Sequence, residues 1–245
     1  MRSPFILFRK LNIRLAIEMS DLIVDEIDYV RKKKEKEYDV SPLKILDLGS
    51  SFGGVWNNVK LRTVFSELEI LITLIDIDRD LLNRASVNGL PQAKFDLQVG
   101  SLPSCLEKFA TDSFDLVLGI DLIEHLSKED SYRLLYEIDR IGKISSILVT
   151  PNGFVWQPPA LNNRYNAHIS SWTSEELKTL GWTRIRGLVG FRSYWGPYSQ
   201  PLRQPTNSFW WEFYALQKII ASFFPKVAFS ILAVKRRKNP RIELQ

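Results

Sequence analysis

The sequence predicts a doubly wound α/β fold in which a seven-stranded, mostly parallel sheet carries helices on both of its faces. The first observation is an alternation that starts after Pro42, where short apolar or β-branched runs take turns with segments of helical periodicity. Strands separated by helices of this length pair in parallel through right-handed crossovers. The second is a turn of Gly and Ser residues after the first apolar run, and the third is an Asp that ends the next run. In such folds a ligand binds beyond the carboxyl ends of the strands.

Seven segments have the length and composition of strands: 45–48, 70–75, 95–99, 114–118, 144–149, 183–192 and 227–235. Helices are expected at 11–29, 55–68, 79–87, 103–109, 128–141 and 209–224, with the charged run 31–37 as a solvated helix end. Ser127 is the expected cap of the helix at 128–141. A further helix begins after Thr173, which forms a capping box with Glu176, and ends before Gly181.

The composition is that of a soluble globular protein. The chain has 245 residues, of which 45% are hydrophobic. The segment Met1–Arg14 is too short and too interrupted by charge to be a signal peptide or a membrane span. The single cysteine, Cys105, excludes an internal disulfide and a cysteine-only metal site. We therefore expect a cytoplasmic protein in which Cys105 is a small buried residue.

The net charge of +5 conceals an uneven distribution. From Thr183 to Gln245 there are 11 Lys and Arg residues against 2 Asp and Glu, so this end carries +9 and the rest of the chain −4. A basic end on a mildly acidic body indicates an anionic partner there, either a membrane surface, a nucleic acid or an acidic substrate. A solvated basic face is the equally weighted alternative.

The most informative stretch is 45–54, ILDLGSSFGG. A buried strand there leads into a turn of small residues that opens a helix, so that the backbone can approach a ligand and offer unpaired N–H groups. Asp47 stands directly before the turn, where a carboxylate can pair with a ligand ammonium. The next strand ends at Asp76, which is placed to accept hydrogen bonds from ribose hydroxyls.

Two classes of nucleotide cofactor fit this layout. A dinucleotide needs the spacing Gly-x-Gly-x-x-Gly so that its pyrophosphate can lie against the turn. Here Gly49 and Gly53 are four positions apart and Ser51 stands between them, so that spacing is absent. Asp47 would also repel a pyrophosphate. A cationic ligand without phosphate is therefore favoured, and a nicotinamide-dependent oxidoreductase is the weaker alternative.

These residues resemble the class I S-adenosylmethionine-dependent methyltransferases. The pattern Asp47-x-Gly49-x-Ser51-x-Gly53 looks like their first motif, and Asp76 matches their second-strand acid. The run 112–126, DSFDLVLGIDLIEHL, is similar to the fourth-strand signature of the ubiquinone-biosynthesis-like, type 11 branch. The resemblance covers roughly 43–149, and a weaker likeness to a poorly characterised prokaryotic subgroup extends through 150–154 and 167–172.

The resemblance implies S-adenosylmethionine as the cofactor and a Rossmann-like methyltransferase fold whose last strand is antiparallel. It also assigns roles around the cofactor. The methionine part is held by the turn motif: Asp47, Gly49, Ser51 and Gly53. The sugar and base are held by residues that follow later strands: Asp76, Ile77, Ser101, Leu102 and Ile120. Two positions depart from the family pattern. Ser51 replaces the usual middle glycine, which a serine can do if its φ is negative, and Ser101 replaces an acid that bonds the adenine amino group.

We expect a single methyltransferase domain, because the chain has no internal repeat and no low-complexity linker. Its first part, 1–42, is a helical cover, and 43–150 is the cofactor-binding half. The substrate-side half, 151–245, contains an aromatic and basic insertion at 193–226.

Transfer of a methyl group from a sulfonium mainly requires alignment of acceptor, methyl and sulfur. A hydroxyl acceptor also needs a base, and the chain has only two histidines, His125 and His168. Both are candidate catalytic residues, with Asp121 as the acid that orients one of them. Each histidine could instead brace a loop, and Asp121 could cap a helix. No His, Cys and Asp cluster has metal-ligand spacing, so we expect no metal.

The sequence limits the class of methyl acceptor mainly by excluding other classes. Strand four lacks the Asn/Asp-Pro-Pro-aromatic clamp of methyltransferases that act on exocyclic base amines, so a nucleic acid is unlikely as the acceptor. The segment 191–229 holds 12 of the 29 aromatic residues. It either packs on the sheet, lines an apolar or sugar-binding cleft, or makes peripheral membrane contact through 209–238. We expect O-methylation of a small-molecule, glycan or lipid-linked acceptor. A non-catalytic methyltransferase-like scaffold and a nucleic-acid methyltransferase are the alternatives.

Overall fold

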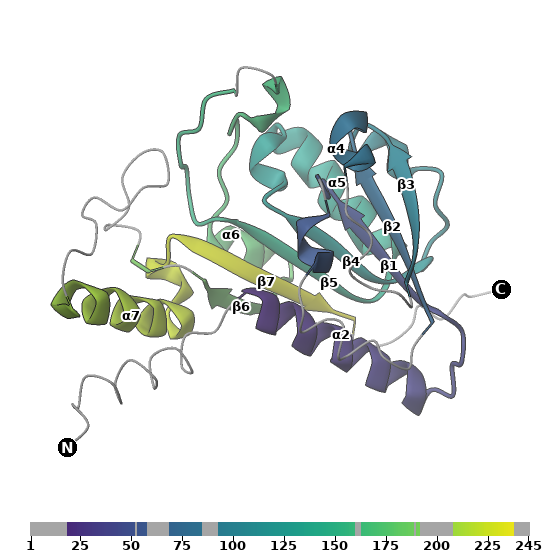
Figure 1. Cartoon of the computed structure of the whole chain (residues 1–245), viewed down its shortest axis with the longest axis horizontal. Coiled ribbons are helices and arrows are strands. Elements are labelled where there is room, and N and C mark those ends of the chain that lie inside the picture. Colours follow the sequence, from purple (N-terminus) through teal and green to yellow (C-terminus); the bar gives the residue numbers. More distant parts are fainter. Residues whose placement is uncertain are drawn as a thin grey trace. The chain divides into compact units, whose positions relative to one another are not determined.

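A computed structural model describes residues 19–51, 53–57, 69–84, 93–159, 163–188, 190–191 and 208–237. Their strands form one seven-stranded sheet in the order β3-β2-β1-β4-β5-β7-β6 (Figure 1). The strands are β1 (Leu43–Leu48), β2 (Ile70–Asp76), β3 (Ala93–Val99), β4 (Phe114–Ile120), β5 (Gly142–Pro151), β6 (Arg184–Gly187) and β7 (Ser230–Arg236). The α-helices are α2 (Met19–Lys36), α4 (Arg79–Asn83), α5 (Lys128–Ile141), α6 (Ser174–Thr179) and α7 (Ser208–Phe223). Short 3₁₀ helices occupy Gly54–Asn57, Ser104–Leu106, Ile123–His125, Arg164–Asn166 and Pro225–Val227.

The first four strands pair in parallel, as predicted. β1 lies between β2 and β4, so that Asp47 is opposite Leu74 on one side and Leu118 on the other. β2 pairs in parallel with β3 in turn. In β1 every residue except Lys44 is buried, which is why the strand reads as a continuous apolar run rather than an alternating one. The carboxyl ends of these strands therefore meet at one edge of the sheet (Figure 1).

The last strand, β7, is antiparallel, which confirms the predicted fold class. The amide of Asn152, after the end of β5, donates to the carbonyl of Phe229 at 2.8 Å. The amide of Arg237, after the end of β7, donates to the carbonyl of Ile144 near the start of β5 at 2.9 Å. The two strands thus run in opposite directions along the same line of hydrogen bonds.

Several predicted helices are confirmed with their caps. α5 spans 128–141, and the Ser127 hydroxyl accepts a hydrogen bond from the Asp130 amide. α6 has the predicted capping box between Thr173 and Glu176, and Gly181 after it has a positive φ of 87°. The predicted helix parts at 11–18, 58–68 and 85–87 lie outside the described residues. The segment 103–109 is shorter than expected, since only Ser104–Leu106 is helical.

Helix α2 carries buried charge that its pattern did not indicate. Its apolar residues Ile23, Ile27 and Val30 are buried, but so are Glu26 and Lys34. Lys34 Nζ forms ion pairs with Asp39 at 2.8 Å and Asp115 at 3.2 Å. The charged run 31–37 is therefore a helix end that is solvated except at Lys34, which is held by two carboxylates.

Apart from residues outside the described ranges, the chain divides into two compact units. One contains Ile123–Leu126 and Val149–Ala233, and the other contains Ser20–Leu122, Ser127–Leu148 and the residues from Val234 on. Within the first unit, the side-chain amide of Asn152 donates to the carbonyls of Pro225, Lys226 and Ala228. The expectation of a single domain stays a prediction. Among the helices described, none is long and apolar enough to cross a membrane.

Candidate functional site

The glycine- and serine-rich turn after β1 lies against the end of β2. The amides of Gly49 and Ser50 both donate to the carbonyl of Ile75, at 2.8 and 3.1 Å. The next amide, that of Ser51, donates to the carboxylate of Asp76 at 2.8 Å. The turn motif is therefore next to the acid at the end of the second strand, as expected if both belong to one ligand site.

The turn has a left-handed backbone at alternate residues. Gly49, Ser51 and Gly53 have φ values of 64°, 52° and 67°. The condition of a negative φ at Ser51 is not met, because this serine adopts the conformation that a glycine would have there. A non-glycine residue in this region carries strain, and the hydrogen bond from its amide to Asp76 helps to hold it. The left-handed φ favours glycine at position 49, and a Cβ there would also lie 2.8 Å from Leu122 Cδ1, so that this side chain would have to move.

Asp47 is buried beneath the turn, with 2% of its surface exposed. Its Oδ2 accepts a hydrogen bond from the indole nitrogen of Trp56 at 2.8 Å. Burial raises the pKa of Asp47 to about 7, the Trp56 hydrogen bond lowers it, and the charge of Asp76 raises it further. The carboxyl is therefore near its midpoint at neutral pH, and a cation beside it would favour the ionised form.

Asp76 is 9% exposed and uses both carboxylate oxygens within the protein. Oδ2 accepts from the Ser51 amide, and Oδ1 accepts from the Asp78 amide at 2.9 Å. Asp78 in turn caps α4 through hydrogen bonds from two amides at its start. Each carboxylate oxygen has a further lone pair, so ribose hydroxyls can still donate to Asp76. Ile77 lies between these two acids in the sequence.

The ends of β3 and β4 contribute the remaining predicted cofactor residues. The amide of Gly100, which precedes Ser101 and Leu102, donates to the backbone carbonyl of Asp76 at 3.0 Å. Ser101 is exposed and Leu102 is half-buried. Ile120 is the last residue of β4.

Asp121 follows Ile120 with a positive φ of 46°. Asp121 is exposed to solvent, and partial desolvation by the protein around it raises the pKa of its carboxyl to about 6. A strained residue with a shifted pKa is a candidate for a functional role.

The two histidines come together with a glutamate, and we call Glu124, His125 and His168 the histidine cluster. The rings of His125 and His168 meet edge to face, with centroids 4.8 Å apart. Glu124 is 2% exposed, and its Oε2 accepts from the Thr150 hydroxyl at 3.0 Å. One potential ligand atom from each residue lies within 4.8 Å of the others. Linear spacing could not reveal this group, since His168 is far along the chain from the adjacent Glu124 and His125.

Both imidazoles are held through Nδ1. His125 Nδ1 lies 3.0 Å from the Ala167 carbonyl, and His168 Nδ1 lies 2.8 Å from the Val155 carbonyl. A carbonyl can only accept, so each Nδ1 carries the hydrogen and each Nε2 has a free lone pair in the neutral ring. Burial lowers the pKa of His125, with a smaller contribution from His168, whereas the Ala167 carbonyl raises it.

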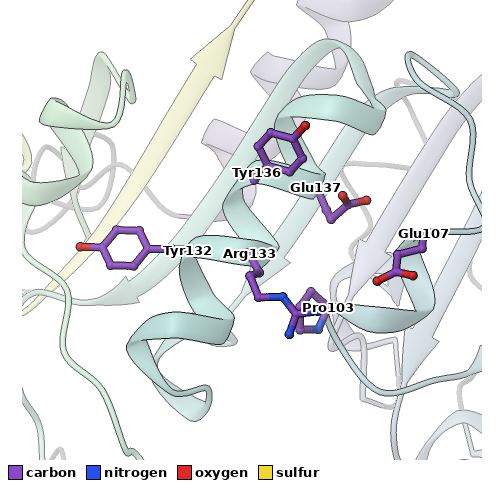
Figure 2. A pocket seen from close by; sticks show the side chains of 6 residues that line it. All are labelled: Pro103, Glu107, Tyr132, Arg133, Tyr136 and Glu137. Atoms are coloured by element: carbon purple, nitrogen blue, oxygen red, sulfur yellow. The ribbon is translucent and has the colours of Figure 1, made fainter.

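A separate surface hollow of about 310 Å³ lies between α5 and the segment from Pro103 to Glu107 (Figure 2). Its lining residues are Pro103, Glu107, Tyr132, Arg133, Tyr136 and Glu137. None of these residues was predicted for the cofactor or for catalysis. The hollow is therefore not the predicted site.

Two residues in or beside the predicted cofactor-binding turn at 49–54 were given no role from the sequence. The first is Trp56, which donates a hydrogen bond to Asp47. The only indication of it in the sequence was a tryptophan shortly after a glycine-rich turn. Ser50 Oγ is buried without a hydrogen-bond partner among the described residues. Glu124 was part of the fourth-strand signature, but it had been given no role.

Residues 46–150 match the family model described as methyltransferase domain. A comparison with curated proteins gives no significant match. Among solved structures, a SAM dependent methyltransferase from Archaeoglobus fulgidus is 16% identical with a TM-score of 0.46, covering 86% of this chain and 94% of that one. A putative sarcosine dimethylglycine methyltransferase from Galdieria sulphuraria is 16% identical with a TM-score of 0.48, covering 88% and 86%. The N-terminal domain of EvdMO1 with SAH bound is 15% identical with a TM-score of 0.45, covering 86% and 80%. Identities and TM-scores this low support no conclusion about the substrate or partners of this chain.

The family match and the sheet order agree with the predicted class of protein. The segment 46–150 matches a methyltransferase domain, the sheet has the order of the predicted class I fold, and the predicted cofactor is S-adenosylmethionine. The residues around the turn fit this cofactor chemically. Asp47 and Asp76 form a buried acidic pair that favours a cation, as the ammonium and sulfonium of S-adenosylmethionine provide, and disfavours a pyrophosphate.

Proposed function

We propose that this S-adenosylmethionine-dependent methyltransferase transfers the methyl group to a hydroxyl oxygen of a small-molecule, glycan or lipid-linked acceptor. The observation that carries the choice of oxygen is the orientation of the two histidines. Each donates through Nδ1 to a backbone carbonyl and so presents Nε2 as a proton acceptor. A hydroxyl must lose a proton during transfer, and an imidazole is the usual acceptor.

When bound, S-adenosylmethionine supplies an electrophilic methyl group on its sulfonium. In the proposal, Asp47 accepts the ammonium of the methionine part, while Gly49, Ser51 and Gly53 let the backbone approach it. Asp76 accepts hydrogen bonds from the ribose hydroxyls. The adenine edge is assigned to residues after the later strands: Ile77, Ser101, Leu102 and Ile120.

His125 and His168 are proposed to accept the hydroxyl proton, and Asp121 is proposed as a positioning residue. In the chain, His125 follows the end of β4 by five positions, in the segment where the fourth-strand signature continues. Turnover by His125→Ala and His168→Ala should be compared at saturating cofactor, with cofactor affinity measured for each variant. A loss of turnover in either variant at unchanged affinity is expected. Full activity in both would remove histidine from the mechanism.

Calorimetry with S-adenosylmethionine and with its demethylated product tests the class of function. Binding of both ligands in the micromolar range, without competition by NAD(H), is expected. No binding of either ligand at high micromolar concentration would favour a non-catalytic scaffold. Competition by NAD(H) would favour an oxidoreductase.

A lipid-linked acceptor is favoured by the surface of α7 and the residues that follow it. Large apolar side chains are exposed at helical spacing here: Phe213, Leu216, Phe223, Phe224 and Val227. Lys226 adds a positive charge beside them. This composition suits contact with an anionic membrane surface. The basic residues at the end of β7 do not contribute, because Lys235, Arg236 and Arg237 form ion pairs with Asp139, Glu26 and Asp112.

A further inference from the structure

The histidine cluster has the supporting contacts of a metal site as well as the ligands. Protein imidazoles that bind metals almost always donate their other ring N–H to a carbonyl or a carboxylate, and metal-binding carboxylates are themselves hydrogen-bonded. Here His125 and His168 bond to the carbonyls of Ala167 and Val155, and Glu124 accepts from the hydroxyl of Thr150.

We propose that Glu124, His125 and His168 bind one divalent transition-metal ion, with Zn²⁺ as the best match. Two imidazole nitrogens and one carboxylate oxygen are the protein ligands of a common kind of catalytic zinc site, which keeps a fourth position open. Soft sulfur ligands are absent from the cluster, and a purely oxygen-based site for Mg²⁺ or Ca²⁺ would not use two imidazoles.

The cluster is somewhat wider than an occupied site. Its ligand atoms lie up to 4.8 Å apart. With metal–ligand bonds of about 2.0–2.1 Å in a tetrahedron, the ligand atoms would be roughly 3.3 Å apart. Closing this difference of roughly 1.5 Å requires the three side chains to move towards one another on metal binding.

Hydrogen bonds join the backbone segments around the cluster, so the three proposed ligands are held near one another before any ion binds. The carbonyl of Glu124 accepts from the amides of Ile169 and Ser170, at 2.9 and 3.1 Å. The Ser170 hydroxyl donates to the Ile123 carbonyl at 3.0 Å, and itself accepts from the indole of Trp172. The segment that follows His168 and the turn that carries His125 are thus joined by hydrogen bonds within one unit.

The link between this site and methyl transfer rests on the proposed function. A divalent ion lowers the pKa of a hydroxyl in its open position, so that the O–H bond breaks, the electron pair stays on oxygen and the proton leaves to solvent. The histidines would then activate the acceptor as ligands rather than as free bases. Metal binding itself can be tested without any turnover.

The test uses the full chain, stripped with a chelator and titrated with Co²⁺ as a visible probe for the Zn²⁺ site. One Co²⁺ per chain is expected, with the absorption of a tetrahedral ion, and Zn²⁺ should displace it. His168→Ala and Glu124→Gln should each weaken Co²⁺ binding by about tenfold or more. Glu175→Gln is the matched control, because Glu175 pairs with Ser174 in the same unit and should leave binding unchanged.

X-ray absorption at the zinc edge of the zinc-loaded natural chain does not depend on any variant being folded. Two imidazoles and one carboxylate around the ion are expected. Absence of Co²⁺ or Zn²⁺ binding, binding that is equal in all variants, or an ion without imidazole ligands would overturn the proposal. Calorimetry with S-adenosylmethionine on the metal-free chain separates the two ideas, since retained cofactor binding without a metal leaves the proposed function standing.

Discussion

The indole nitrogen of Trp56 donates a hydrogen bond to Oδ2 of Asp47 across 2.8 Å, and both side chains are buried beside the predicted cofactor-binding turn at 49–54. An N–H donor of this kind stabilises the carboxylate, yet burial outweighs it and raises the pKa of Asp47 to about 7. The free protein therefore holds a proton on Asp47 in a good fraction of molecules at neutral pH. A cationic ligand must displace that proton.

Cofactor affinity should consequently rise with pH between pH 5.5 and 7. A raised pKa means that Asp47 is mostly protonated at the lower end of this window, and the ionised form binds the ammonium better. Each unit below the pKa costs up to about a factor of ten in affinity, so a change of roughly tenfold is expected across the window. Calorimetry with S-adenosylmethionine at constant ionic strength measures it.

Asp47→Asn is the control for that pH dependence, because it keeps the shape and removes the titration. Its affinity should be lower at pH 7 and nearly independent of pH. If the natural protein and Asp47→Asn show the same pH profile, the titrating group lies elsewhere.

Asp76→Ala should weaken cofactor binding by on the order of 1–3 kcal/mol, through lost hydrogen bonds to ribose hydroxyls. The variant should also be less stable, because the amides of Ser51 and Asp78 lose their acceptor. Affinity is measured by calorimetry and stability by urea denaturation. Unchanged affinity in a folded variant would show that the acid at the end of β2 has no role in cofactor binding.

Ser51→Gly should stabilise the protein by on the order of 0.5–1 kcal/mol. Relief of the left-handed conformation, about 1–2 kcal/mol, exceeds the extra chain entropy that glycine loses on folding. The matched control is Ser51→Ala, which removes the same hydroxyl but keeps a Cβ in the left-handed conformation, and it should destabilise slightly. The urea midpoints of the two variants are expected to move in opposite directions, and a shared direction contradicts the strain at Ser51.

Glu26→Ala should be the most damaging of these changes to folding. Glu26 is 3% exposed, binds the Nε and Nη2 atoms of Arg236 at 2.8 and 2.7 Å, and accepts from Ser145. Removing one partner of a buried pair costs about 3–5 kcal/mol. Glu69→Ala is the control, because its pair with Lys94 is exposed and is expected to contribute about 1 kcal/mol or less. Equal losses in thermal denaturation would mean that Glu26 is less buried in solution.

The double variant Phe223→Ser and Phe224→Ser should bind anionic phospholipid vesicles more weakly than the natural chain. The two rings are 64% and 63% exposed, so their replacement should leave the melting temperature nearly unchanged. Sedimentation with vesicles measures binding, and neutral vesicles show the part that charge contributes. If the natural chain does not sediment with anionic vesicles, α7 does not contact membranes.

Much of the parallel half of the sheet was predictable from the sequence. In β1 and β4 the apolar runs are buried on both faces, so hydrophobic patterning alone finds them, and the Ser127 and Thr173 caps fix where α5 and α6 begin. The acid at Asp76 was predictable for the same reason, since it stands where a buried run ends.

The features that escaped prediction depend on contacts between distant residues. The amide of Ser51 is bound by the carboxylate of Asp76, so residue type alone does not determine the sign of φ at this position. The proximity of Glu124 to His168 depends on a loop that returns through backbone hydrogen bonds. Charge counting likewise could not reveal that Arg236 and Arg237 are neutralised by Glu26 and Asp112.

The polypeptide passes from one compact unit to the other after Met19, Leu122, Leu126, Leu148 and Ala233. Neither unit is therefore a continuous piece of sequence, and no single cut by a protease can release one of them whole. Glu124 and His125 belong to the four-residue segment Ile123–Leu126. The residues on both sides of this segment belong to the other unit, which contains Asp47 and Asp76. An insertion or deletion at either flank thus falls at a boundary between the two units, and neither unit can be exchanged between relatives by grafting one uninterrupted segment.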